Sequence, residues 1–368
     1  MSQSSIKGAF DTALERVLGD PFDPAPVDAS EGDLVTLLAA TDAAQKERLM
    51  ARAREVRDRF CGRRMVVRAL IEFSSYCRNS CFYCGLNRNN LQASRYRLGA
   101  DEILESVALA WRSGIRTVVL QSGEDGLDAV WLAGVIEDIK QMGDMAVTLS
   151  VGERSREDYA LWRRAGADRY LLRIETTDPA LYRSLHEGRE VTTRLACLET
   201  LREEGYQVGS GFMVGPPGQT IEHIARDIRF LAGIATDMIG VGPFIPHPDT
   251  PFRDAAPGDV GLTLRVLAVL RLVTRRSWMP ATTALGSLDR DYRIDALKAG
   301  ANVLMPNFSP ASVKKQYAIY PGKRCVDEPT GACAGCTAGL AHAGGLEMDW
   351  SRADSLMHEA PGELRYQP

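Results

Sequence analysis

The segment VVRALIEFSSYCRNSCFYCG, residues 66–85, joins a β-rich apolar run to three closely spaced cysteines. Similar runs recur along the chain, and each is followed by an amphipathic segment of helical length. Such alternation predicts a parallel sheet, and eight units over about 240 residues predict a complete (β/α)8 TIM barrel. An open doubly wound sheet is the alternative, because periodicity does not prove closure. The expected strands are residues 66–74, 117–123, 146–152, 169–175, 206–215, 238–245, 280–284 and 302–307.

Three joins between helix and strand share one form, in RSGIRTVVL, RAGADRYLL and KAGANVLMP. Each places glycine just past a helix end and an apolar strand directly after it. We expect three parts: an N-terminal helical segment over 1–60, the barrel over 61–308, and a loop-rich C-terminal cap over 309–368.

Composition narrows the class of protein. The chain has 368 residues, 45% apolar and 25% charged, with a net charge of −4 and no basic tract. A globular enzyme with a small-molecule substrate is expected, without nucleic-acid or membrane binding. The N-terminus has no signal-peptide core and no window is apolar enough to span a membrane, so we expect a cytoplasmic protein.

Six of the eight cysteines fall into two triplets. In a reducing cytosol this clustering favours metal ligation over disulfides. The first triplet, Cys77, Cys81 and Cys84, has the spacing C-x3-C-x2-C. Thiolates select zinc or iron–sulfur clusters, and a structural zinc requires four protein ligands. Three thiolates on a [4Fe–4S] cube leave one iron open to a small molecule, so the sequence favours a cluster, with zinc as the alternative.

With Tyr83 directly before its third cysteine, this run resembles the signature of the radical S-adenosylmethionine superfamily. The resemblance implies a [4Fe–4S] cluster and S-adenosylmethionine as cofactors. Polar residues expected at the carboxyl ends of the strands could also bind S-adenosylmethionine. The alternatives are that these residues only form turns, and that Glu175 and Arg194 form an ion pair with each other. Met213 and Ile245 are either adenine contacts or core residues. The expected cofactor-binding residues are Tyr83, Gln121, Ser122, Thr148, Ser150, Glu175, Arg194, Met213 and Ile245.

Several longer segments, among them VVLQSGED, AGADRYLLRIETTDP and GVGPFIPHPDTP, resemble the HydE family of [FeFe]-hydrogenase maturases. This resemblance implies radical attack on an iron carbonyl cyanide complex that carries cysteine and comes from a HydG-like maturase. The product would pass toward a HydF-like scaffold. A radical enzyme of the same subgroup acting on an amino acid is the alternative, and a non-catalytic cluster or zinc carrier is another. A low-potential ferredoxin or flavodoxin is the expected electron donor.

Arg173, Thr282 and Thr283 are candidates for an anion-binding patch inside the barrel, because one guanidinium and two hydroxyls all donate hydrogen bonds. A core salt bridge and plain β-propensity are the alternatives. Some relatives have histidine between the arginine and the glutamate, where this chain has Ile174. If that imidazole has a proton-transfer or hydrogen-bonding role in those relatives, the role is absent here.

The second triplet, Cys325, Cys333 and Cys336, resembles a further cluster site found in part of the HydE family, where it is dispensable. It would hold an iron–sulfur cluster, zinc or nothing. Turnover is not expected to depend on it.

Overall fold

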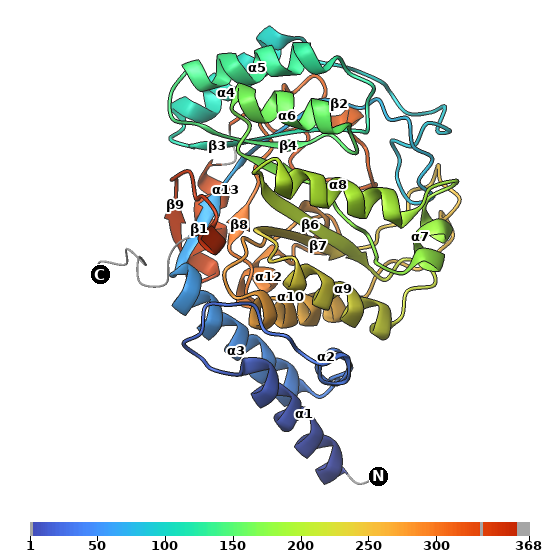
Figure 1. Ribbon diagram of the computed structural model, residues 1–368, viewed down its shortest axis with the longest axis vertical. Helices are drawn as coiled ribbons and strands as arrows, with labels where there is room; N and C mark the ends of the chain where they lie inside the picture. The colour runs from blue at the N-terminus through green and yellow to red at the C-terminus, as the bar shows by residue number, and fades with distance from the viewer. Residues whose placement is uncertain (1–2, 332–333, 359–368) are drawn as a thin grey trace.

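The structure, a computed structural model, describes residues 3–331 and 334–358. Helices and strands alternate through most of this part of the chain (Figure 1). The strands are β1 (Arg64–Val67), β2 (Ala69–Ser74), β3 (Thr117–Ser122), β4 (Ala146–Ser150), β5 (Arg169–Leu171), β6 (Gln207–Val214), β7 (Met238–Pro243), β8 (Val303–Leu304) and β9 (Glu347–Asp349). The helices are α1 (Gln3–Leu18), α2 (Glu31–Leu38), α3 (Ala43–Cys61), α4 (Ala100–Arg112), α5 (Ala129–Gln141), α6 (Arg156–Ala165), α7 (Pro179–Leu185), α8 (Val191–Glu203), α9 (Ile221–Gly233), α10 (Val260–Thr274), α11 (Thr283–Gly286), α12 (Arg293–Lys298), α13 (Ala334–Ala343), and the short 3-10 helices η1 (Lys314–Gln316) and η2 (Leu356–His358).

The described strands form two parallel sheets, in the orders β2-β3-β4-β5-β6-β7 and β8-β1-β9. β1 and β2 are the two halves of the first expected strand, interrupted at Arg68. Within the larger sheet Ile71 lies opposite Leu120, and Leu120 opposite Leu149, all fully buried. A parallel sheet buried in this way is typical of an α/β fold, so the α/β class with a parallel sheet is confirmed.

The three expected joins between helix and strand are confirmed in their geometry. Gly114, Gly166 and Gly300 have φ values of 87°, 111° and 105°, which lie in the region that glycine adopts without strain. Each glycine therefore ends its helix and turns the chain directly into the next strand or bridge.

The strand expected at residues 280–284 does not form, and this prediction is wrong. In its place the chain makes isolated parallel bridges, from Met238 to Trp278 and from Pro280 to Val303. Proline has no N–H to donate to a ladder, and helix α11 begins at Thr283. On the other side a single bridge joins Leu70 to Asn307. The two sheets are thus linked by single bridges, and no continuous eight-stranded ladder is present in the described residues.

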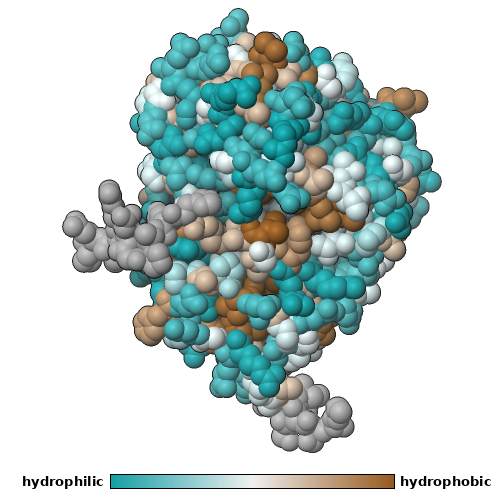
Figure 2. All heavy atoms as spheres, in the orientation of Figure 1, coloured by the Kyte–Doolittle hydropathy of each residue, from teal (hydrophilic) through white to brown (hydrophobic). Residues whose placement is uncertain are grey.

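The N-terminal helices pack against α9 and α10 on the outside of the sheets, and extend from one end of the molecule (Figure 1). Hydrogen bonds fix them there: Arg275 on the end of α10 donates to the carbonyl of Leu18 at 2.7 Å, and Arg265 donates to that of Leu38 at 2.7 Å. Hydrophilic side chains cover much of the face in Figure 2. None of the described helices is long and apolar enough to cross a membrane.

The tail from residue 309 contacts both ends of the sheets. At the carboxyl ends, the carbonyl of Ile319 accepts a hydrogen bond from the N–H of Gly85 at 3.0 Å. At the amino ends, the hydroxyl of Thr117 donates to the carbonyl of Arg352 at 2.7 Å. Between these contacts α13 and β9 run along the outside, with β9 paired to β1. Residues 317–323 therefore lie over the mouth, and residues 352–355 close the opposite end.

Candidate active site

The carboxyl ends of the strands open onto a cavity of about 360 Å³. Thr148 is the one predicted mouth residue outside its wall: it is 2% exposed within β4, and its hydroxyl has no partner among the described residues. The predicted residues that line the cavity are Cys77, Cys81, Tyr83, Cys84, Gln121, Ser122, Ser150, Arg173, Glu175, Arg194, Met213, Ile245, Thr282 and Thr283. Side chains far apart in the sequence thus meet in one space, as expected for the carboxyl ends of parallel strands.

The three cysteines lie in a loop that a single arginine holds together. Arg95 donates to the carbonyl oxygens of Ser75 at 2.6 Å, Leu86 at 2.9 Å and Asn87 at 2.8 Å. A guanidinium has five donors in a rigid fork, so it can satisfy several loop carbonyls at once. Both ends of the cysteine loop are thereby joined to one side chain.

Two glycines let this loop approach its neighbours closely. A Cβ atom on Gly123 would lie 2.3 Å from the carbonyl oxygen of Tyr76 and 2.9 Å from the Cβ of Cys77. A Cβ atom on Gly85 would lie 2.2 Å from the carbonyl oxygen of Ala318. The glycine of the SGED segment is therefore required by the packing of the cysteine loop, beyond any role in a turn.

Burial raises the pKa of all three thiols. For Cys81, burial is reinforced by repulsion from Cys84 and Cys77, and for Cys84 burial and repulsion from Cys77 raise the pKa to about 12. Three thiolates in this space need nearby positive charge, which the iron ions of a cluster supply. In the part of the chain that the structure describes, no three His, Cys, Asp or Glu side chains are arranged around a single metal ion. The donor set fits an iron–sulfur cube, in which each cysteine binds its own iron.

Tyr83 is fixed by a histidine that the sequence did not single out. Its hydroxyl lies 2.9 Å from Nε2 of His186, and Nδ1 of His186 lies 3.0 Å from the carbonyl oxygen of Tyr182. Because a carbonyl only accepts, Nδ1 carries the hydrogen and Nε2 accepts from the tyrosine. Burial lowers the pKa of His186 to about 3, so the ring is neutral. A backbone bridge also joins His186 to Cys81, which places this histidine behind the cysteine loop.

Arg194 belongs to a network of charged groups at one side of the cavity. Its Nε donates to Glu153 at 2.6 Å, and its Nη2 lies 3.7 Å from Glu124. Arg189 pairs with both of these glutamates, and Asn79 donates to Glu124 at 2.6 Å. Glu124 lies in the VVLQSGED segment named above, and Glu153 directly follows the strand expected at 146–152. Their pairing joins four separate parts of the chain.

Glu175 pairs with Arg173 at 3.0 Å, and the expected alternative of an ion pair with Arg194 does not form. Glu175 has a φ of 62°, an uncommon conformation for a residue with a side chain. Ile174 is fully buried and does not line the cavity. The isoleucine at this position therefore contributes no group to the cavity wall.

Two donors in the cavity wall have no partner among the described residues, Nε of Arg173 and the hydroxyl of Thr282. Thr283 lines the same space. A buried donor without an acceptor costs free energy unless a ligand or water satisfies it. The patch expected from the sequence is thus assembled, with donors that remain available to an anion.

Part of the cavity wall comes from the tail expected to form a cap, although none of these tail residues was a predicted site residue. Lys323 forms an ion pair with Glu72, and the two side chains are only 8% and 1% exposed. Glu72 also accepts a hydrogen bond from Asn307 at 2.7 Å, and Gln121 donates to the hydroxyl of Tyr317 at 3.3 Å. These contacts fasten residues 317–323 over the cavity.

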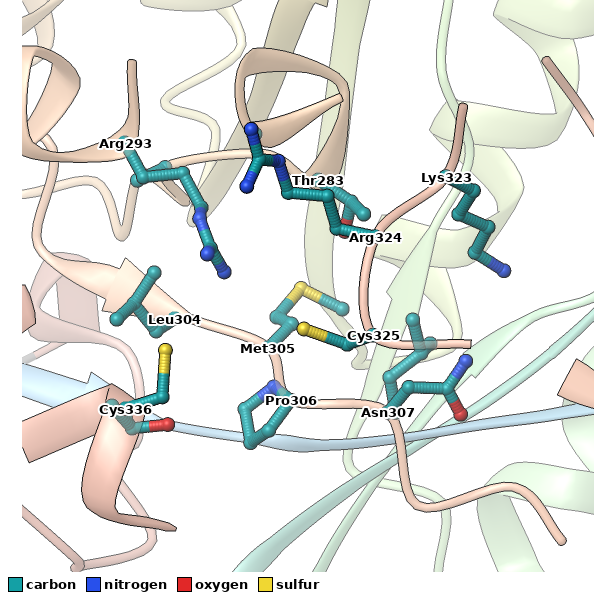
Figure 3. Close-up of a pocket in the computed structure, with 14 residues that line it drawn as sticks. Thr283, Arg293, Leu304, Met305, Pro306, Asn307, Lys323, Arg324, Cys325 and Cys336 are labelled. Carbon is teal, nitrogen blue, oxygen red and sulfur yellow. The ribbon is translucent and has the colours of Figure 1, made fainter. Parts of the chain in front are cut away.

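Cys325 and Cys336 of the second triplet border a separate, smaller cavity of about 40 Å³. Figure 3 shows the sulfur atoms of Cys325 and Cys336 pointing toward the same space, with Arg293 above it. Cys333 lies outside the described residues. Thr283 and Lys323 line both cavities, so this pocket adjoins the mouth.

The fold and the three-cysteine loop define a class of protein, the radical S-adenosylmethionine enzymes. The family model described as "Radical SAM superfamily" matches residues 71–231. The chain is 45% identical over 318 residues to the [FeFe] hydrogenase maturase subunit HydE of Thermotoga maritima, covering 85% of this chain and 90% of that protein. The chain therefore belongs to the HydE family of radical S-adenosylmethionine enzymes, which use a [4Fe–4S] cluster and S-adenosylmethionine as cofactors.

The chain is also similar to methylornithine synthases, and it shares its fold with the maturase HydG. It is 30% identical over 294 residues to a 3-methylornithine synthase of Methanosarcina barkeri, covering 79% of this chain and 83% of that protein. The crystal structure of methylornithine synthase (PylB) superimposes with a TM-score of 0.78 at 27% identity, covering 94% of this chain and 98% of that one. A crystal structure of the maturase HydG superimposes with a TM-score of 0.78 at 17% identity, covering 96% of this chain and 81% of that one, which shows a shared fold.

Proposed function

We propose that this enzyme takes part in maturation of the [FeFe]-hydrogenase H-cluster and acts on a cysteine-bound iron carbonyl cyanide precursor inside the cavity. The observation that carries the proposal is the 45% identity to a HydE maturase over 90% of its length. The precursor would come from a HydG-like maturase, and the product would pass to a HydF-like scaffold. A low-potential ferredoxin or flavodoxin would supply electrons.

Different residues of the cavity wall would bind different parts of the two cofactors. Cys77, Cys81 and Cys84 would hold the cluster, and when bound the cluster and S-adenosylmethionine supply a 5′-deoxyadenosyl radical by one-electron reduction. Backbone and side-chain groups near Gln121, Ser122 and Ser150 would bind the methionine part, with Glu175 and Arg194 facing its ammonium and carboxylate. Met213 and Ile245 would contact the adenine, while Thr148, buried outside the cavity wall, is the weakest of the expected contacts.

Arg173, Thr282 and Thr283 would bind the anionic precursor. The unpartnered donors on Arg173 and Thr282 support this role, since cyanide and carboxylate groups accept hydrogen bonds. The strap of residues 317–323 would exclude water from the radical, because its buried ion pair with Glu72 holds it over the mouth.

We also infer that the two sheets act as one closed barrel, with residues 278–281 in the place of a seventh strand. The bridges from Met238 to Trp278, Pro280 to Val303 and Leu70 to Asn307 support this closure. The division into parts 1–60, 61–308 and 309–368 stays a prediction, as does a cytoplasmic location. An iron–sulfur or zinc site at Cys325, Cys333 and Cys336 likewise stays a prediction.

A radical enzyme that acts on an amino acid remains the second candidate, favoured by the likeness to 3-methylornithine synthase. The two candidates differ in what increases formation of 5′-deoxyadenosine. The maturase should respond to the HydG product, and the second candidate should respond to a free amino acid.

The test is anaerobic reconstitution followed by reduction with dithionite in the presence of S-adenosylmethionine. We expect 5′-deoxyadenosine, and active hydrogenase when HydG-like and HydF-like proteins and the apo-hydrogenase are added. Cys81→Ser, which lacks a cluster ligand, serves as the inactive control. Hydrogenase that becomes equally active without this enzyme would refute the proposal, and stimulation by one of the common amino acids would favour the second candidate.

A further inference from the structure

The cysteine loop comes nearest to the surface at Cys77. Its two neighbours, Tyr76 and Arg78, are both exposed, with Tyr76 43% exposed and the Arg78 side chain 53% exposed. Cys81 and Cys84 have no exposed neighbour of this kind in the chain. The edge of the site at Cys77 is therefore the place where an external electron carrier can approach most closely.

The same loop is basic, although the chain as a whole is acidic. Residues 73–100 contain four arginines and no aspartate or glutamate, in a chain with a net charge of −4. Arg95 is used inside the loop, Arg97 pairs with Asp125, and Arg78 pairs with Glu124. Arg88 is exposed and makes no ion pair with any described residue. Its charge is thus fully presented to solvent.

An apolar side chain projects beside these charges. Leu91 is 91% exposed, the most exposed of the large apolar side chains described. Figure 1 shows the loop between β2 and α4 standing out from one side of the molecule, and Figure 2 shows hydrophobic atoms projecting at that place. Exposed apolar groups among arginines and a tyrosine are typical of protein interfaces.

We propose that Tyr76, Arg78, Arg88 and Leu91 form the docking surface for a small acidic electron-transfer protein. The inference rests on the proposed function and names the surface through which that function receives its electrons. In each encounter the reduced donor would lose one electron to the cluster that Cys77, Cys81 and Cys84 would hold, so no other reactant is required. Apolar contact at Leu91 and Tyr76 would fix the pose, and the arginines would select an acidic partner.

The distribution of charge on the enzyme explains why an acidic donor should dock at this loop and not elsewhere. An acidic donor is repelled by a chain of net charge −4 and attracted only where basic residues gather. The loop is such a place, and it lies next to the cluster ligands. Steering of this kind weakens as salt screens the exposed charges.

The test compares two ways of reducing the reconstituted holoenzyme. Formation of 5′-deoxyadenosine is measured with dithionite, and separately with a flavodoxin reduced by its reductase and NADPH. Arg88→Glu and Leu91→Ala are the test variants, since both side chains are exposed and folding should not depend on them. Arg226→Glu is the matched control, an exposed arginine on α9 away from the loop.

We expect dithionite-driven rates to match the wild type in all variants. With flavodoxin, Arg88→Glu should raise the KM for the donor about tenfold, equivalent to about 1.4 kcal/mol, and should reduce its dependence on salt. Leu91→Ala should raise the KM several-fold, with Arg226→Glu unchanged. An unchanged KM in both test variants, or an equal change in the control, would overturn the docking surface. No product from the wild type with dithionite would instead refute the proposed function itself.

Discussion

Removing the cation from the buried pair between Lys323 and Glu72 should loosen the strap over the mouth, and the size of the effect follows from burial. In Lys323→Met, Glu72 is left 1% exposed with only the 2.7 Å hydrogen bond from Asn307. Breaking a buried pair on one side typically costs about 3–5 kcal/mol.

The expected loss in the free energy of unfolding is therefore about 3–5 kcal/mol. Lys315→Met, in the short helix η1 just before the strap, is the matched control, since its ion pair with Asp327 is exposed, at 67% and 74%, and should contribute under about 1 kcal/mol. In the double variant Glu72→Gln with Lys323→Met, most of the loss should be recovered, because no buried charge remains.

Two assays measure this effect: urea unfolding, and hydrogen exchange of the backbone amides of residues 317–323. If Lys323→Met loses no more stability than Lys315→Met, the buried pair does not hold the strap.

Three further predictions concern the cavity and its surroundings. Cys81→Ser should abolish formation of 5′-deoxyadenosine, measured by chromatography, whereas Cys336→Ser should leave it largely intact; the reverse pattern would show that the second triplet is the essential one. Arg173→Gln should lower kcat/KM for maturation by about 10- to 100-fold through loss of a charge-assisted hydrogen bond, with cleavage of S-adenosylmethionine little changed. Burial raises the pKa of Asp227 from 3.8 to about 6, so the folded state binds a proton more readily than the unfolded state. The titration of Asp227 should therefore lower the free energy of unfolding by about 3 kcal/mol as the pH rises from about 4 to 6. In Asp227→Asn, the free energy of unfolding should depend less on pH in that range, as measured by urea unfolding.

The elements found from the sequence are those whose signal is local. Gly114, Gly166 and Gly300 end helices because only glycine adopts their φ values without strain, and that requirement is visible wherever glycine follows an amphipathic run. The prediction of a strand at residues 280–284 was wrong, and the reason is also local. The threonines of this segment suggest a strand, but Pro280 removes a ladder donor and Thr283 begins a helix.

The contacts that the sequence could not reveal join distant segments. Glu72 and Lys323 are separated by 251 positions, and neither has a neighbour that signals the pair. β9, with the sequence EMD, lacks the apolar pattern of a strand, and it forms because the edge of β1 is open beside it. His186 behind Tyr83 is likewise determined by packing between two loops. Tertiary contacts of this kind override what local pattern predicts.

The charge balance of the cavity wall bears on the choice between an anionic complex and an amino acid. Glu72 pairs with Lys323, Glu124 with Arg189, and Glu175 with Arg173. The carboxylates of the described wall are therefore already neutralised, and one of them, Glu175, would be needed for the ammonium of S-adenosylmethionine. The free groups are donors, on Arg173 and Thr282. A second ammonium, such as that of an amino-acid substrate, would find no unpaired carboxylate in the described wall, whereas a ligand rich in acceptors would satisfy donors that otherwise stay unpaired at a cost of about 1–3 kcal/mol each. The unpaired donors therefore support the proposed anionic complex over an amino acid.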